Sequence, residues 1–307
     1  MPSKCDERVL ESLRAGKMVG VVEGITNNDY HSLDKYWSST QIKYMADNSP
    51  LHFKAKYIDK ILEPREQTES LALGSLIHCL TLDPDSFARE FLILPELNLR
   101  TKEGREIRDS ILKENPGKTI IKQETLQVAH EMVASILRTS RAVDLLKGLK
   151  KELAYFWTCP YSGLPLRAKA DAIGASLVEL KTVMSARKDD FEKQVDNLNY
   201  DLALWHYVTG AKIQPEFGAL EGGVWFIAIE KEPPYVCEVY EAHESVLEVG
   251  QAKWLDAIDK ISDGVFKNYW PGFVSVRAVD SGLLMPTPWG AKKWLKSEIT
   301  KELSGGV

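Results

Sequence analysis

Residues 164–182, Leu-Pro-Leu-Arg-Ala-Lys-Ala-Asp-Ala-Ile-Gly-Ala-Ser-Leu-Val-Glu-Leu-Lys-Thr, predict a β-hairpin. The first strand ends in Ala-Asp-Ala-Ile, and Gly-Ala-Ser forms the turn. The second strand is Leu-Val-Glu-Leu-Lys-Thr. Because side chains alternate along a strand, Glu179 and Lys181 share one face and the Val178 and Leu180 side chains face the core. Asp171 lies across the turn and can reach the face of Glu179.

This hairpin brings two carboxylates and one ammonium together at the end of an apolar element. Two carboxylates can bind a hard divalent cation through oxygen. A nearby lysine can stabilise a developing oxyanion or position a water molecule. Such a set suits phosphodiester hydrolysis. The pattern Asp-(x)7-Glu-x-Lys is short, so the residues alone leave open an ordinary surface strand that carries a Glu–Lys pair.

Composition describes an ordinary soluble globular protein. The chain has 307 residues, enough for one large domain or two modest ones, with 44% hydrophobic and 27% charged residues. Its net charge of -5 excludes a global basic field. If the partner is nucleic acid, the basic contacts must therefore be local.

The cysteines and the early apolar segment indicate a reducing, cytoplasmic setting. The four cysteines are scattered without ligand spacing, so neither a disulfide framework nor a zinc site is expected. The longest early apolar run, from Met18 to Val22, is too short for a signal-peptide core or a membrane span. We therefore expect no membrane association.

The remaining pattern alternates helices and strands. Helices are expected at about residues 6–15, 39–45, 51–62, 67–82, 123–149, 186–208, 243–261 and 289–303. Further strands are expected at 152–158, 224–230 and 235–242. Irregular backbone is expected at 24–30, and an exposed loop at 101–105. This order predicts an α/β fold with a central sheet flanked by helices.

The helix expected at residues 67–82 is almost entirely apolar and should be buried. His78 lies one turn after Gly74 on this helix. From these residues alone it is either a hydrogen-bonded core histidine or a metal ligand. The lysines at 54, 56 and 60 similarly fit either a solvated helix face or a phosphate-facing surface.

Several motifs together resemble the RecB-type branch of the PD-(D/E)XK nuclease superfamily, and in particular RecE-type exodeoxyribonuclease VIII nuclease domains of phage origin. The resemblance covers about residues 24–275. In chain order it is carried by Gly74-x-x-x-His78 with the following Cys-Leu-Thr-Leu-Asp-Pro-Asp85, the Arg100–Gly104 region, Glu152, Gly163-Leu-Pro-Leu-Arg-Ala-Lys-Ala-Asp171, Glu179-Leu-Lys-Thr182 and Tyr207.

The resemblance implies a metal site. His78, Asp171 and Glu179 would be ligands of Mg2+, with Mn2+ able to substitute, and the Leu180 carbonyl would be a further ligand. Lys181 would orient or activate the attacking water. The implied fold is the PD-(D/E)XK nuclease fold, a central mixed sheet flanked by helices, with helical N-terminal additions.

Two further residues take roles from the same resemblance. Glu152 would be an accessory acid near the metal. Tyr207 matches the tyrosine of the family's Gln-x-x-x-Tyr motif, which contacts DNA or supports the site. The chain departs from that motif, because Ala203 stands at the glutamine position.

The implied organisation has three parts. Residues 1–66 would be a helical N-terminal part packed on the core, residues 67–275 the nuclease core, and residues 276–307 a C-terminal helical tail. The basic residues that could contact DNA are Lys54, Lys56, Arg141, Lys150 and Arg167.

The implied activity is metal-dependent, processive 5′-to-3′ degradation of double-stranded DNA ends, which leaves a 3′ single strand for recombination. The implied partners are DNA ends, a ring-shaped homo-oligomer, and a single-strand annealing protein or recombinase. Three alternatives remain: a metal-dependent endonuclease or nickase with the same site, a non-catalytic DNA-binding recombination scaffold, and a hydrolase that acts on another class of substrate.

Overall fold

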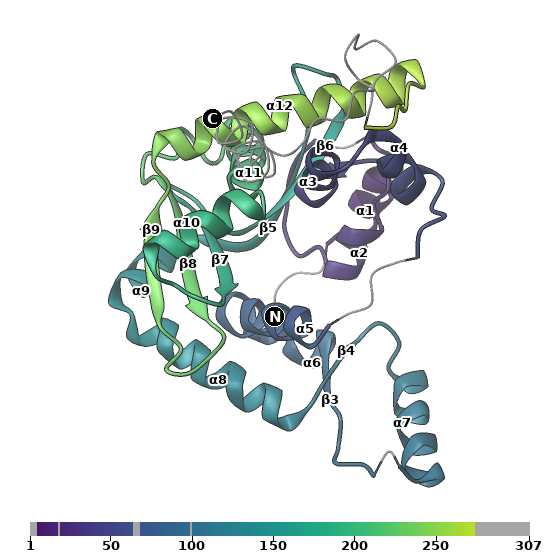
Figure 1. Ribbon diagram of the computed structural model, residues 1–307, viewed down its shortest axis with the longest axis vertical. Coiled ribbons are helices and arrows are strands. Elements are labelled where there is room, and N and C mark those ends of the chain that lie inside the picture. Colours follow the sequence, from purple (N-terminus) through teal and green to yellow (C-terminus); the bar gives the residue numbers. More distant parts are fainter. Residues whose placement is uncertain (1–4, 18, 64–67, 99, 274–307) are drawn as a thin grey trace, which may run out of the picture.

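A central mixed β-sheet with helices on both faces organises the protein, as the computed structural model shows (Figure 1). The structure describes residues 5–17, 19–63, 68–98 and 100–273. The central strands run in the order β1-β5-β6-β7-β8-β9, and β2 pairs with β6. Their bounds are β1 (Gly20–Val22), β2 (Trp37–Ser38), β5 (Lys150–Thr158), β6 (Pro165–Ile173), β7 (Leu177–Val183), β8 (Val224–Glu230) and β9 (Cys237–Glu241). This arrangement confirms the expected fold class.

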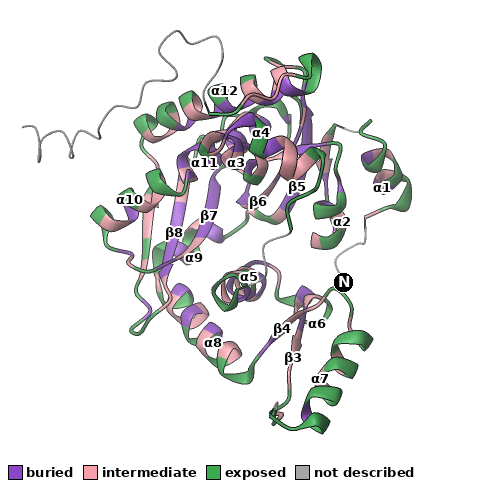
Figure 2. Ribbon diagram, turned by 45° about the vertical axis from the view of Figure 1, so that its right-hand side comes forward, coloured by how far each residue is buried: buried purple, intermediate pink, exposed green. Residues whose placement is uncertain are grey.

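Helices and one small sheet surround these strands. The helices are α1 (Glu7–Arg14), α2 (Asn27–Ser32), α3 (Ser39–Asp47), α4 (Pro50–Phe53), α5 (Glu69–Leu82), α6 (Phe87–Glu90), α7 (Lys102–Glu114), α8 (Gln123–Arg138), α9 (Ser140–Leu146), α10 (Lys188–Asn197), α11 (Tyr200–Ile213) and α12 (Glu244–Lys267). A parallel pair, β3 (Phe91–Ile93) and β4 (Thr119–Ile121), carries α7 away from the body, and α7 is exposed along most of its length (Figure 2).

The predicted hairpin is present as β6 and β7. The two strands are antiparallel, with Ala172 opposite Val178 and Ile173 opposite Leu177, and β7 continues into a parallel pairing with β8. The pairing of β6 with β7 stops after these two positions, although both strands continue. The strands therefore separate just beyond the turn, and this separation shapes the candidate site.

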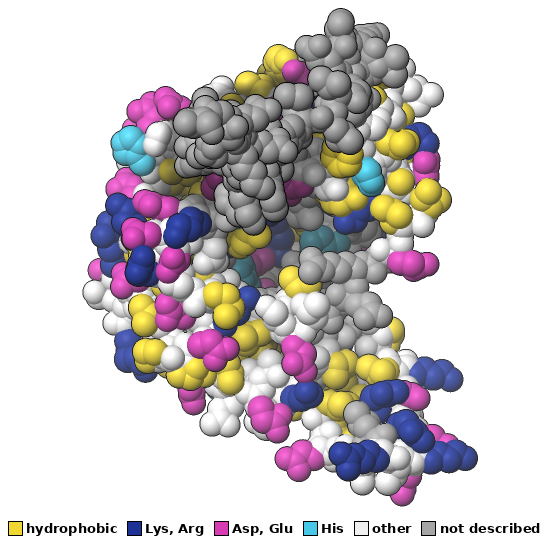
Figure 3. Space-filling view, viewed as in Figure 1, with side chains coloured by type: hydrophobic (Ala, Val, Ile, Leu, Met, Phe, Trp, Pro, Cys, Tyr) yellow, Lys and Arg dark blue, Asp and Glu magenta, His cyan; other side chains and the backbone are white. Residues whose placement is uncertain are grey.

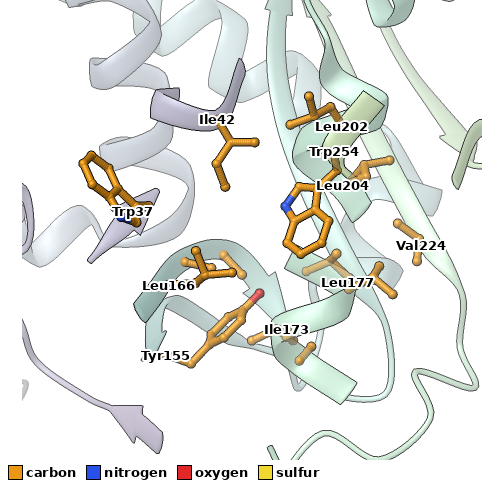
Figure 4. Close-up of a cluster of buried hydrophobic side chains, with 14 of the residues drawn as sticks. Trp37, Ile42, Tyr155, Leu166, Ile173, Leu177, Leu202, Leu204, Val224 and Trp254 are labelled. Atoms are coloured by element: carbon orange, nitrogen blue, oxygen red, sulfur yellow. The ribbon is translucent and has the colours of Figure 1, made fainter. Parts of the chain in front are cut away.

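Apolar side chains cover both faces of the sheet. On one face, the sheet packs against α3, α11 and α12 in a cluster that includes Ile42, Leu204 and Trp254 (Figure 4). On the other face, Val178 and Leu180 join a second cluster with residues of α5 and α8. The alternation predicted for β7 is thus confirmed, because its even-numbered residues pack against α5 and α8.

Two local expectations are wrong because side chains cap helices there. Residues 24–30, expected to be irregular, contain the start of α2, where the Thr26 hydroxyl accepts from the Asp29 amide at 3.1 Å. The loop expected at 101–105 is the start of α7, where Thr101 accepts from the Gly104 amide at 3.1 Å.

Three expected helices are interrupted. The helix expected over 186–208 is two helices, α10 and α11, because Asn199 adopts a left-handed conformation with φ of 51°. The helix expected over 123–149 breaks at Thr139 into α8 and α9. The helix expected over 51–62 begins as α4, continues as π-helix over Lys54–Ile58 and ends there.

The expected C-terminal tail, with its helix at 289–303, lies outside the described residues. Among the residues that the structure does describe, none of the helices combines the length and the apolar character needed to cross a membrane.

A buried histidine joins α11 to the sheet and to α12. The His206 Nε2 lies 2.8 Å from the Arg167 carbonyl, and the Trp254 indole donates to its Nδ1 at 3.1 Å. Since Nδ1 accepts a hydrogen bond, the ring is neutral with its proton on Nε2. Burial lowers the pKa of His206 to about 4. Protonation would break the bond from Trp254 and place a charge in the core.

His206 should therefore make stability depend on pH. The pKa of His206 in the folded state lies below its unfolded value near 6.5. Its contribution to the stability of the fold is therefore complete above pH 6.5 and is lost as the pH falls towards 4. Between pH 7 and pH 4.5, this difference in pKa should lower the free energy of unfolding by about 2 kcal/mol. Urea unfolding of wild type and His206→Gln should show a correspondingly smaller loss in the variant, whatever its stability at pH 7. His130→Gln, which changes an exposed histidine, is the control. Equal pH dependence in wild type and His206→Gln would contradict this account.

Candidate metal centre

Three carboxylates come from neighbouring strands at the level where β6 and β7 separate. The pairs Lys151–Ala172 and Leu153–Ala170 place Glu152 of β5 opposite Asp171 of β6. The last pair between β6 and β7, Ala172–Val178, places Glu179 of β7 next in the same row. The register thus brings together acids that are 27 or fewer residues apart in sequence.

Asp171 lies in the gap between β6 and β7. Its Oδ2 accepts from the Leu180 amide at 2.7 Å, in place of the backbone carbonyl that a continuous ladder would supply. The same oxygen lies 3.8 Å from the Lys181 Nζ. Its Oδ1 lies 3.2 Å from the His78 Nδ1. One carboxylate therefore contacts β7 through one oxygen and α5 through the other.

The half-buried helix α5 places His78 at this gap. Its neighbours Leu76 and Ile77 are fully buried and pack on the sheet, which fixes the helix against β7. One ligand atom from each of His78, Glu152 and Asp171 lies within 4.8 Å of the others. His78 and Asp171, two of the three expected ligands, therefore lie together, and the third member of the group is Glu152, the expected accessory acid, in place of Glu179.

Glu152 reaches the cluster through an unusual backbone conformation. Its φ is 51°, in the left-handed region that residues other than glycine rarely adopt. Such residues kink a strand and redirect its side chains, and they concentrate at functional sites. The Glu152 carboxylate pairs with the Lys169 Nζ at 2.6 Å, and Lys169 also donates to Asn27 of α2.

Glu179 and Lys181 form a second, more buried part of the site. The Lys181 Nζ donates to the Glu179 Oε2 at 2.7 Å and to the Leu180 carbonyl at 3.3 Å. Glu179 is only 2% exposed, and its Oε1 is buried without a hydrogen-bond partner. Glu179 is not part of the three-residue cluster of His78, Glu152 and Asp171, and Lys181 links it to Asp171.

Burial and neighbouring charges shift the pKa values of Asp171 and Glu179 in opposite directions. Burial raises the pKa of Asp171, but His78 and Lys181 outweigh it and lower the value to about 2. Burial and the adjacent Asp171 raise the pKa of Glu179 to about 7, against the opposing effect of Lys181. Burial lowers the pKa of Lys181, but the two carboxylates reverse this and hold its ammonium charged.

The donor set fits a divalent cation. An imidazole nitrogen and carboxylate oxygens are suitable ligands for Mg2+ or Mn2+, and ligand distances of about 2.1 Å bring neighbouring donors to roughly 3–4 Å. The 3.2 Å contact of His78 with Asp171 already has this spacing. The unpartnered Glu179 Oε1 provides a further anionic atom beside the group.

The other predicted site residues take different positions. The Tyr207 hydroxyl lies 3.2 Å from the Ser39 Oγ, so this tyrosine joins α11 to the first turn of α3. Ala203 is buried in the helix and offers no polar group where the family motif has glutamine. The Leu180 carbonyl accepts from Lys181, which accounts for one of its two lone pairs.

These groups line one side of a large cleft. Its volume is about 1380 Å³, and His78, Glu152, Asp171 and Tyr207 are among its lining residues. Figure 3 shows the hollow between the upper and lower parts of the molecule, with charged and histidine side chains in its depth. Of the predicted DNA-contacting residues, the cleft is lined by Lys56 and Arg167.

The other three basic candidates contact other side chains of the protein. Lys54 pairs with Asp59, Lys150 pairs with Glu23, and Arg141 lies over the Trp225 ring. They are not among the residues that line the cleft within the described part of the chain.

Sequence reasoning missed two cations beside the site. Lys169 precedes Asp171 by two residues on β6, a spacing that places both side chains on one face and could have indicated its role. Lys43 of α3 lies 5.5 Å from the Tyr200 ring, and Lys181 lies 5.6 Å from the same ring. No local sequence signal links Lys43 to the hairpin, because only the packing of α3 brings it there.

Comparison with known proteins agrees with this geometry. Residues 38–274 match the family described as a PDDEXK-like domain of unknown function (DUF3799). The chain belongs to this family. The fold is also similar to the crystal structure of a proposed exonuclease from Eubacterium rectale, with a TM-score of 0.54 and 17% identity over 78% of this chain and 86% of that chain. No protein with a curated description matches the sequence.

Metal binding should depend on the three-residue cluster. Asp171→Asn keeps the size of the side chain but removes its charge, so we expect Mn2+ affinity to fall at least about tenfold. Isothermal titration calorimetry with Mn2+ measures this directly, and the thermal stabilisation by saturating Mn2+ should fall in parallel. Asp196→Asn is the matched control, since Asp196 is an exposed carboxylate paired with Lys253 on the surface. Undiminished Mn2+ affinity in Asp171→Asn would place the metal elsewhere.

Proposed function

We propose that the protein is a metal-dependent DNA nuclease that degrades duplex DNA from its ends. The observation that carries the proposal is the cluster of His78, Glu152 and Asp171 beside the Glu179–Lys181 pair, in a cleft of a PDDEXK-like domain. Acids, a histidine and a lysine at one position of a large open cleft suit hydrolysis of a polymeric phosphodiester.

Different residues of the site would bind the metal and orient the attacking water. His78, Glu152 and Asp171 would hold Mg2+ or Mn2+, with Glu179 beside them. When bound, the ion lowers the pKa of water and neutralises negative charge that develops on the phosphate. Lys181 is held charged between Glu179 and Asp171, and its ammonium would orient the attacking water or stabilise the developing oxyanion.

The cleft is lined by cations and carboxylates in equal number, six of each, in a protein whose net charge is -5. Three of the cations, Lys60, Arg89 and Lys169, pair with carboxylates of the same lining. The other three, Lys56, Lys151 and Arg167, would contact phosphates, and a bound divalent cation would add positive charge at the acids. The solved protein with a similar fold is itself described only as a proposed exonuclease, which is consistent with this proposal without deciding it.

The finer features of the proposal follow the resemblance to RecE-type nucleases. They are processive 5′-to-3′ resection, a 3′ single-stranded product for an annealing protein or recombinase, and a ring-shaped homo-oligomer that encloses the strand. An endonuclease or nickase would use the same residues, because the difference lies in the path of the DNA.

Digestion of linear duplex DNA labelled at the 5′ or 3′ end, compared with covalently closed circles, tests the proposal. With Mg2+, we expect end-dependent loss of duplex with early release of the 5′ label. EDTA should abolish it, and Lys181→Ala should reduce the rate at least about 100-fold. Lys212→Ala, which removes an exposed lysine of α11, should leave the rate unchanged.

The same experiment separates the alternatives. Cleavage of closed circles would replace the exonuclease with an endonuclease. DNA binding without cleavage in either Mg2+ or Mn2+ would replace it with a binding scaffold. Full activity in Lys181→Ala would contradict the assignment of the site.

A further inference from the structure

Arg167 is a buried cation on β6 with few partners. Its side chain is 5% exposed, and it is one of the residues that line the cleft. One terminal nitrogen donates to the Tyr30 carbonyl, and the guanidinium lies 4.7 Å from the centre of the Tyr30 ring. Its Nε is buried and has no hydrogen-bond partner. Among the described residues, the structure shows no carboxylate paired with it.

This arrangement leaves a charge uncompensated. A guanidinium carries five N–H donors, and buried charges are ordinarily paired because removing them from water is costly. The contacts with Tyr30 attach α2 to β6, but the Tyr30 carbonyl and ring supply no negative charge. Asp34 also lines the cleft, yet it is largely exposed and lies 3.9 Å from Lys60. An anion from outside the chain would complete the partners of Arg167.

The first turn of α3 lies beside Arg167. Strand β2 pairs in parallel with β6 and places Ser38 next to Arg167, and α3 begins immediately after Ser38. Residues Ser38, Ser39, Thr40 and Gln41 all line the cleft. The N-terminus of a helix carries partial positive charge, which favours an anion. In α3, a capping box between Ser38 and Gln41 satisfies the amides of these two residues, which leaves the amides of Ser39 and Thr40 for a ligand. A buried guanidinium and a helix N-terminus therefore face the same part of the cleft.

The distance from the metal cluster defines what this part of the cleft can bind. Arg167, Lys169 and Asp171 are alternate residues of β6, so their side chains follow one face of the strand. Four residues of extended strand span about 13 Å. Arg167 is therefore too far along the strand to contact the phosphate held at Asp171, but it can contact another phosphate of the same nucleic acid strand.

We propose that Arg167 and the first turn of α3 form an anion subsite that binds a phosphate group of the substrate strand, separate from the phosphate that is cleaved. The inference rests on the proposed nuclease function and adds to it a second point of attachment. The strand would then be held by Arg167 at one phosphate and by the metal cluster at another, which fixes its register in the cleft.

The test measures binding without cleavage, in EDTA, by fluorescence anisotropy of labelled single-stranded and end-frayed duplex oligonucleotides. Arg167→Met keeps a side chain of similar length but removes the charge. We expect roughly tenfold weaker binding and a decrease of about 0.7 in the slope of log affinity against log salt for the single strand. Lys212→Met is the control and should bind as wild type does.

A scan with single neutral methylphosphonate linkages identifies the phosphate. One position should weaken binding by wild type and have little further effect on Arg167→Met. Oligonucleotides with a 5′-phosphate or a 5′-hydroxyl distinguish a terminal phosphate from an internal one, since only a terminal site would respond to the end group.

Circular dichroism and thermal unfolding establish that the variants are folded, because Arg167 also holds Tyr30. Should Arg167→Met fail to fold, Arg167→Lys keeps the charge and should retain both the salt slope and the response to the critical methylphosphonate, with weaker binding because the forked guanidinium contact is lost. Wild-type affinity and slope in Arg167→Met, or additive effects in the scan, would overturn the subsite and leave the nuclease proposal intact. Absence of nucleic acid binding by wild type, both in EDTA and with Ca2+, would overturn both.

Discussion

The candidate site depends on the separation of β6 from β7. Adjacent strands normally pair along their whole length, but here the backbone ladder ends two residues after the turn. Asp171 fills the gap with its own carboxylate and accepts the hydrogen bond of the Leu180 amide. The Leu180 amide is therefore satisfied in the gap, and the second oxygen of Asp171 contacts His78. Any residue without an acceptor at this position would leave Leu180 unpaired and remove the connection to α5.

Charge balance explains how several ionisable groups remain buried together. Carboxylates in such proximity would repel one another, but each contacts a group that reduces the repulsion: Lys169 pairs with Glu152, Lys181 pairs with Glu179, and the His78 ring contacts Asp171. The balance is incomplete at the Glu179 Oε1, which is buried without a partner. This oxygen lies beside the group of ligand atoms formed by His78, Glu152 and Asp171. Both features are compatible with a divalent cation at the site.

The sequence predicts the parts of this site that follow local rules. Alternation along the hairpin predicts which face carries Glu179 and Lys181. The apolar pattern of α5 predicts a buried helix, and this is correct only in part, because Leu76 is buried whereas Leu71 is 50% exposed. The left-handed backbone of Glu152 and the break at Asn199 are not apparent, because neither residue is a glycine and tertiary packing selects these conformations. The caps formed by Thr26 and Thr101 are local, and they were overlooked because the residues after them are polar. Lys43 depends on packing across the fold, whereas the spacing of Lys169 from Asp171 on one strand was a local signal.

The N-terminal segment belongs to the same physical unit as the metal cluster. Strands β1 and β2 extend the central sheet by pairing with β5 and β6, so the segment is not merely a helical addition to its surface. Asn27 holds Lys169, and Ser39 holds the hydroxyl of Tyr207 across 168 residues of sequence. These contacts place the cations and the cleft wall relative to Asp171. Because each contact is long-range, the geometry of the cluster and of the cleft wall depends on the packing of the N-terminal elements.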